Sequence, residues 1–149
     1  MSGRRRVFLP LPPAELSILA ADTDLPTAGR QAYAVTAVVR AAYPDQDEEE
    51  LEYDALCVAA QSLAPSSGAS APVVLAADLL EHQVVDVVPY PGPAQDQPVE
   101  AEIGYAVRLT VALAAQHVVS IHVAEDADPD AELLWYDASE LPHLADRLA

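Results

Sequence analysis

Two apolar runs, Val73-Val-Leu-Ala-Ala77 and Val84-Val-Asp-Val-Val88, decide the expected fold. Each is short and rich in valine, which is typical of a β-strand that is buried on at least one face. Only residues 78–83 separate the two runs. A parallel return would need a crossover of a dozen or more residues, so we expect strands connected this closely to run antiparallel.

The same pattern continues to the C-terminal end. Tyr105–Leu113 alternates in part between apolar and polar residues, Val118–Val123 follows after a short turn, and Leu133–Tyr136 is a last short apolar run. Ser139–Leu148 has the spacing of a closing helix. We therefore predict an antiparallel meander in the C-terminal half.

Strands and helices alternate in the N-terminal half. Arg6–Leu11 is predicted to be a first strand that ends in a Pro-Pro turn, and Ala32–Thr36 a second strand. A short helix is expected after each strand, the first ending near Asp22 and the second covering Ala37–Tyr43. The second helix must end there because Pro44 follows.

A longer helix is predicted to begin at Asp47. Aspartate is a favoured N-cap, Glu50 stands in capping-box position, and the two glutamates between them lie against the positive end of the helix dipole. Beyond Asp54 this helix is apolar over most of its circumference. We therefore expect it to be covered on more than one side.

These elements predict an α+β fold, in which helices pack on one mixed β-sheet. The alternative is an α/β fold, which would result if the N-terminal half makes right-handed parallel crossovers. The 149 residues are expected to form a single domain. Flexible connectors are expected at 65–72, which is rich in serine and alanine, and at 89–98, which is rich in proline.

The chain is strongly acidic, with 24 Asp and Glu against seven arginines, no lysine, and a net charge of −17. Residues 1–43 hold five of the arginines and three acidic residues, so the negative charge lies in residues 44–149. Such a charge repels phosphate backbones and anionic lipids, so we expect neither nucleic-acid nor membrane binding. The single cysteine, Cys57, excludes an intramolecular disulfide and favours a reducing compartment, so the expected location is cytoplasmic.

No residue pattern of a common enzyme class is present in the sequence. None of the serines has the glycine-flanked setting of a hydrolase nucleophile, and the glycines are scattered singly, without a lysine to meet a phosphate. His117 and His122 lie near the acidic stretch 126–130, but the ligand set for a metal is incomplete. We predict no cofactor, no metal and no catalytic residue.

Two features suggest contact with another protein. The dense carboxylates of 45–54 could steer a basic partner, although helix capping and solubility also explain them. The only tryptophan stands beside a tyrosine, and this pair could either anchor a partner or pack on the sheet. The candidate partner-binding residues are Asp47, Glu48, Glu49, Glu50, Glu52, Trp135 and Tyr136.

A set of short segments also carries a family resemblance. In order along the chain they are Arg6-Val-Phe-Leu-Pro10, Ala34-Val-Thr36, Asp47-Glu-Glu-Glu-Leu-Glu-Tyr53, Ala76-Ala-Asp78, Ser120-Ile-His-Val123 and Glu132-Leu-Leu-Trp-Tyr136. Together they resemble an uncharacterised family of actinobacterial proteins of unknown function. The resemblance implies a small cytoplasmic protein without inherited catalytic residues.

The sequence therefore favours a non-enzymatic, cytoplasmic protein-binding or regulatory domain with a basic protein partner. Two alternatives stay open. One is an acidic mimic of nucleic acid that occupies a DNA-binding protein, although residues 55–77 hold no carboxylate where such mimicry needs a regular spacing. The other is an enzyme that uses dispersed carboxylates. The oligomeric state is not decided by the sequence.

Overall fold

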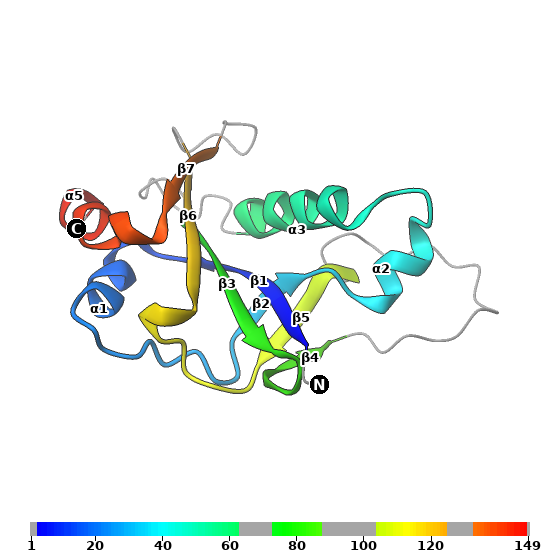
Figure 1. The fold of residues 1–149 in the computed structure, drawn as a ribbon, viewed down its shortest axis with the longest axis horizontal. Helices are drawn as coiled ribbons and strands as arrows, with labels where there is room; N and C mark the ends of the chain where they lie inside the picture. Colours follow the sequence, from blue (N-terminus) through cyan, green and yellow to red (C-terminus); the bar gives the residue numbers. More distant parts are fainter. Residues whose placement is uncertain (1–2, 63–72, 88–103, 125–132, 149) are drawn as a thin grey trace.

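The computed structural model describes residues 3–62, 73–87, 104–124 and 133–148 (Figure 1). Within these ranges seven strands form one sheet in the order β4-β5-β2-β1-β3-β6-β7. The strands are β1 (Arg4–Leu11), β2 (Gln31–Ala34), β3 (Val73–Leu80), β4 (Val84–Asp86), β5 (Ala106–Leu109), β6 (Val118–Ala124) and β7 (Leu133–Asp137). The helices are α1 (Leu16–Ala20), α2 (Ala37–Ala42), α3 (Glu48–Ser62) and α5 (Leu141–Leu148). The connectors predicted at 65–72 and 89–98 lie outside the described residues.

The predicted α+β class is confirmed, but the sheet is antiparallel throughout rather than mixed. The α/β alternative required a crossover helix that returns the chain to the start of β1. The five residues of α1 span only about 8 Å, whereas the eight residues of β1 span about 26 Å. The chain therefore re-enters the sheet near the end of β1, and β2 runs back beside it with Val7 opposite Ala34.

The predicted C-terminal meander is correct only in part. The pairs β4–β5 and β6–β7 are antiparallel neighbours, but β3 pairs with β1 and β6 and not with β4. The reason is that β1 and β3 match over eight residues, from Arg4 opposite Leu80 to Leu11 opposite Val73. This ladder places β1 and β2 in the centre of the sheet, so β3 lies on one side of them and β4–β5 on the other (Figure 1).

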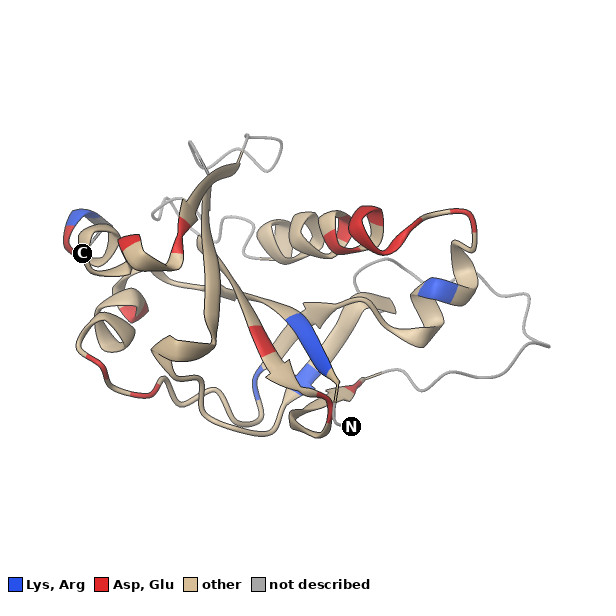
Figure 2. Cartoon of the chain, viewed as in Figure 1, with Lys and Arg blue, Asp and Glu red and all other residues tan. Residues whose placement is uncertain are grey.

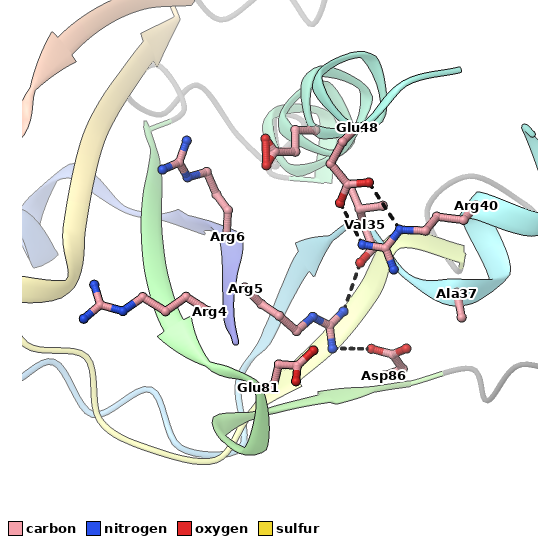
Figure 3. A pocket seen from close by; sticks show the side chains of 10 residues that line it. Arg4, Arg5, Arg6, Val35, Ala37, Arg40, Glu48, Glu81 and Asp86 are labelled. Carbon is pink, nitrogen blue, oxygen red and sulfur yellow. Dashed lines mark hydrogen bonds and ion pairs between the residues drawn. The ribbon is translucent and has the colours of Figure 1, made fainter. Parts of the chain in front are cut away.

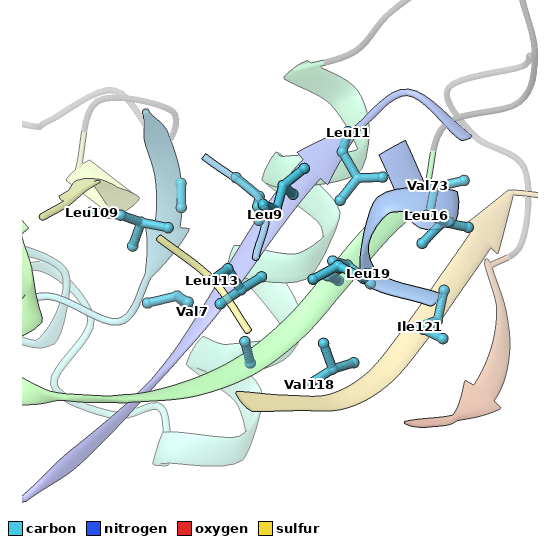
Figure 4. Packing of buried hydrophobic residues seen from close by; sticks show 14 of the residues in the cluster. Val7, Leu9, Leu11, Leu16, Leu19, Val73, Leu109, Leu113, Val118 and Ile121 are labelled. Atoms are coloured by element: carbon cyan, nitrogen blue, oxygen red, sulfur yellow. The ribbon is translucent and has the colours of Figure 1, made fainter. Parts of the chain in front are cut away.

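Helices cover both faces of the sheet. Because successive side chains of a strand point to opposite faces, the odd-numbered residues of β1 and β3 pack with α1 and α5, as Figure 4 shows for Leu9, Leu16 and Leu19. The even-numbered Phe8 and Val74 pack on the other face in a second cluster with α3. The strands at the centre are therefore buried on both sides.

The long helix is buried along one side only. Its fully buried residues are Leu51, Ala55, Leu56 and Ala59, which form one stripe against the sheet, whereas Tyr53 is 65% exposed. Within the described residues the expectation of cover on more than one side was therefore wrong, because Tyr53 is exposed and the other apolar residues outside the stripe, Cys57, Val58 and Ala60, are only half-buried. In the described ranges, no helix is long and apolar enough to cross a bilayer.

The centre of the sheet gives a stability prediction. Leu75 is fully buried in β3, opposite Leu9 of β1 and Ile121 of β6. Leu75→Ala should lower the free energy of unfolding by about 2–5 kcal/mol, since it removes buried surface and leaves a cavity. Urea denaturation measures this loss. Val85→Ala on β4, where the valine is 53% exposed, is the control and should change stability by no more than about 0.5 kcal/mol. Equal effects of the two variants would contradict the central role of β3.

Candidate functional site

The acidic start of α3 is built as the sequence predicts. The amide of Glu50 donates to Oδ1 of Asp47 at 2.8 Å, and the amide of Asp47 donates to Oε1 of Glu50 at 3.5 Å. This capping box holds both side chains at the first turn, where a negative charge is stabilised by the helix dipole. Part of the acidity in this segment therefore serves the helix itself.

The five acidic candidates on this helix face different surroundings. Arg40 of α2 donates two hydrogen bonds to Glu48, at 2.7 and 3.2 Å, and these hold the pKa of Glu48 below its ordinary value. Glu52 is half-buried, and this burial raises the pKa of its carboxyl group even though the Arg6 guanidinium acts against it. Asp47, Glu49 and Glu50 are exposed and form no ion pair within the described residues.

Trp135 and Tyr136 point to opposite faces of β7. Tyr136 lies opposite Ile121 and packs against the cluster that contains α1 and α5. Trp135 lies opposite His122 and is 63% exposed, and its neighbour Leu134 is 40% exposed. Tyr136 therefore packs on the sheet, whereas the indole of Trp135 is accessible to a partner.

The structure does not bring the two groups of candidates together. The helix α3 packs on β1, β2 and β3, and its acidic first turns lie at the end that points away from β7 (Figure 2). A partner that contacts Trp135 would therefore not contact Glu49 or Glu50 through the same small surface.

His117 and His122, which lie near the acidic stretch 126–130 in the sequence, have separate structural roles. Nε2 of His122 lies 2.9 Å from Oγ of Ser120, both residues are buried, and burial lowers the pKa of His122 to about 4. His117 lies in the turn η3 (Ala115–His117), where its Nδ1 accepts a hydrogen bond from the amide of Ala114. The acidic stretch 126–130 lies outside the described residues. Among the described residues, no group of three or more His, Cys, Asp and Glu could hold a metal.

The lone cysteine does not have the surroundings of a nucleophile. Cys57 lies on α3 and is half-buried, and this burial raises the pKa of its thiol. A raised pKa leaves little thiolate at neutral pH, so the thiol is a poor nucleophile there.

One polar pocket was not foreseen from the sequence. It has a volume of about 290 Å³ and lies between the start of β1, α2, the first turns of α3 and β4 (Figure 3). Its lining contains Arg4, Arg5, Arg6, Arg40, Glu48, Glu52, Glu81 and Asp86. The run of three arginines at 4–6 in so acidic a chain was a signal for this site, but its partners come from positions far along the sequence.

Ion pairs fix three of the four arginines of this pocket. The register of β1 and β2 ends at Ala34, and beyond it Arg5 donates to the carbonyl oxygen of Val35 at 3.0 Å and forms an ion pair with Asp86 of β4 at 2.7 Å. Arg6 donates two hydrogen bonds to Asp78, its direct neighbour on β3, at 3.0 and 3.2 Å. Arg5, Arg6 and Arg40 therefore have fixed positions in the lining of the pocket.

Burial of His122 gives a prediction about pH. Its pKa is about 4 in the folded protein and about 6.5 when unfolded, so below pH 6.5 the unfolded chain binds a proton that the folded protein does not. The contribution of neutral His122 to the free energy of unfolding is complete above about pH 6.5. As the pH falls towards 4, this contribution should be lost, and the total loss is about 3 kcal/mol.

Denaturation curves of the wild type and His122→Gln measure this loss, because the difference in the free energy of unfolding between them should change over that pH range. His143→Gln, at an exposed position on α5, is the control. A constant difference between wild type and His122→Gln would contradict the prediction.

Among the comparisons with known proteins, only the one with family models gave a match. Neither the search of curated proteins nor the search of solved structures found a match. A family model described as a family of unknown function, DUF6912, matches residues 5–131. This match spans most of the chain, and among the described elements it covers β2 to β6 completely. It also covers β1 and the lining of the arginine pocket, in both cases without Arg4. The protein belongs to the DUF6912 family, as the resemblance to an uncharacterised family led us to expect.

Proposed function

We propose that the protein is a binding domain for a basic partner protein, and that an extended segment of this partner docks along the outer edge of β7. The observation that carries the proposal is the 63% exposure of Trp135 on a strand at the end of the sheet. A large exposed aromatic residue on an edge strand is a typical anchor for a protein partner.

The edge itself supports docking of an extended segment. β7 pairs with β6 over five residues, and within the described ranges no strand pairs with its other edge. An unpaired edge presents main-chain N–H and C=O groups, to which an added strand can bind. Leu134 and Trp135 lie on the two faces of β7, so the side chains of an added strand would find an apolar neighbour on either face.

The charge of the protein selects the kind of partner. At a net charge of −17, two copies of this chain repel each other, which disfavours pairing of β7 with a second β7. Asp137 is the last residue of β7 and Glu140 lies three residues beyond it, so the local charge is also negative. A segment rich in Lys and Arg is therefore favoured, because its charges complement both the edge and the whole molecule.

The exposed acidic residues of α3 fit a role in the encounter with the partner, before the contact at β7 forms. They lie away from β7, so they cannot form the contact itself, but their field can accelerate the encounter with a basic protein. In this proposal, Trp135 contributes to the affinity of the complex, and Glu49 and Glu50 raise its association rate.

The enzyme alternative is less well supported by the same observations. Ser120 and His122 are the one nucleophile and base with a hydrogen bond between them that the described residues offer, and both are buried. A histidine with a pKa of about 4 is a weak base, so it would not activate the serine at neutral pH. The pair is better explained as a satisfied polar contact in the interior.

Trp135→Ala tests the docking contact. A photoreactive phenylalanine analogue in place of Trp135 first captures the partner from a lysate of the native host, and the crosslinked segment is then synthesised as a peptide. The affinity of this peptide should fall about tenfold or more in Trp135→Ala, because the anchor is lost. Tyr43→Ala, which removes another exposed aromatic residue, is the control and should bind like the wild type. Capture of an acidic segment, or equal affinity of the two variants, would refute the proposal.

The double variant Glu49→Gln/Glu50→Gln tests the role of α3. Stopped-flow binding of the same basic partner protein should show a lower association rate at low salt and an unchanged dissociation rate, because only the long-range attraction is reduced. The difference between the variant and the wild type should vanish at high salt. A change confined to the dissociation rate would place these two residues in the contact and contradict the assignment.

A further inference from the structure

The arginine pocket has a composition that the overall charge does not explain. Acidic residues outnumber arginines by more than three to one in the chain, yet four of the seven arginines line this one pocket. Three come from β1 and the fourth, Arg40, from α2. They share the lining with four carboxylates, so the pocket is rich in charge but close to neutral.

Two of the arginines are held ready for a carboxylate. Arg5 is fixed by Asp86 and by the carbonyl oxygen of Val35, and Arg40 is fixed by its two hydrogen bonds to Glu48. Figure 3 shows both guanidinium groups turned towards the main chain at Val35. A guanidinium group has five N–H donors, and these contacts use at most two from each arginine. Donors therefore remain on two neighbouring guanidinium groups whose positions are already set.

Two of the carboxylates have no cation of their own. Glu52 and Glu81 line the same pocket, and neither forms an ion pair within the described residues. Glu52 is half-buried, and burial raises the pKa of its carboxyl group, which means that Arg6 does not compensate its charge fully. A positive group placed in the pocket would be stabilised by these carboxylates.

We propose that this pocket binds a small zwitterion of the amino-acid class, with its carboxylate on Arg5 and Arg40 and its ammonium group towards Glu81 and Glu52. A simple anion would meet the carboxylates of the lining, and a simple cation would meet the arginines. A molecule that carries both charges satisfies both sides. A volume of about 290 Å³ admits a molecule of this size and lies at the lower limit for small-molecule sites.

This site is independent of the contact proposed for β7. The pocket lies at the start of β1 and beside β4, whereas β7 is at the opposite end of the sheet. Loss of binding at one site therefore gives no reason for loss at the other.

Calorimetric titration of the purified protein tests the proposal. The probes are glycine, L-glutamine and γ-aminobutyrate, which place the two charges at different distances, with acetate and methylammonium as probes of a single charge. At least one zwitterion should give saturable binding, and each single-charge probe should bind about tenfold more weakly or worse, because it makes only one of the two charged contacts. Saturable binding of acetate alone would show an anion site and overturn the proposal, as would the absence of binding by all three zwitterions.

Two variants locate the binding. Arg40→Gln and Glu81→Gln each remove one charge from an exposed part of the lining, and each should weaken the zwitterion about tenfold or more. Circular dichroism checks that both variants keep the fold. Arg108→Gln, at an exposed position on β5 that does not line the pocket, is the matched control and should bind like the wild type. Equal loss in Arg108→Gln, or unchanged affinity in both pocket variants, would overturn the proposed site.

Discussion

The continuous pairing of β1 with β3 is the constraint on which the rest of the structure depends. Eight residues of each strand are in register, and their side chains alternate between the cluster under α1 and α5 and the cluster under α3. A strand of this kind must be apolar at every central position, as Val7-Phe-Leu9 and Val73-Val-Leu-Ala-Ala77 are. Every other strand takes its place relative to this pair, and β2 and β6 bind to its two outer edges.

Local features of the fold could be predicted from the sequence, and distant pairings could not. The strand near residue 73, the helix α2 before Pro44 and the capping box of Asp47 and Glu50 all depend on neighbours within a few residues. The pairing of β3 with β1 instead of β4 depends on a match between segments that are far apart in the chain. Short connections correctly indicated the antiparallel direction, but they do not decide which strands are neighbours.

The same distinction applies to the candidate site. Trp135 and the acids of α3 were conspicuous in the sequence because each stands out locally, and the fold then separates them (Figure 2). The arginine pocket was inconspicuous because its charges come from β1, α2, α3, β4 and the short turn between β3 and β4 that holds Glu81. Arg5 also has a structural role that only the structure reveals. The pairing of β2 with β1 ends at Ala34, and beyond this point Arg5 connects β1 with Val35 and with β4.

The central position of β1 has a consequence for how the chain folds. Leu11 pairs with Val73 and Arg4 with Leu80, so the main ladder closes loops of more than sixty residues. Such distant contacts have a high entropic cost before they stabilise anything, and proteins that depend on them fold slowly, in about milliseconds to seconds. During synthesis β1 leaves the ribosome before β2 and can pair with it, but the main-chain N–H and C=O groups of its other edge have no partner until β3 follows. The nascent chain is therefore most vulnerable to aggregation in the interval between the emergence of β2 and that of β3.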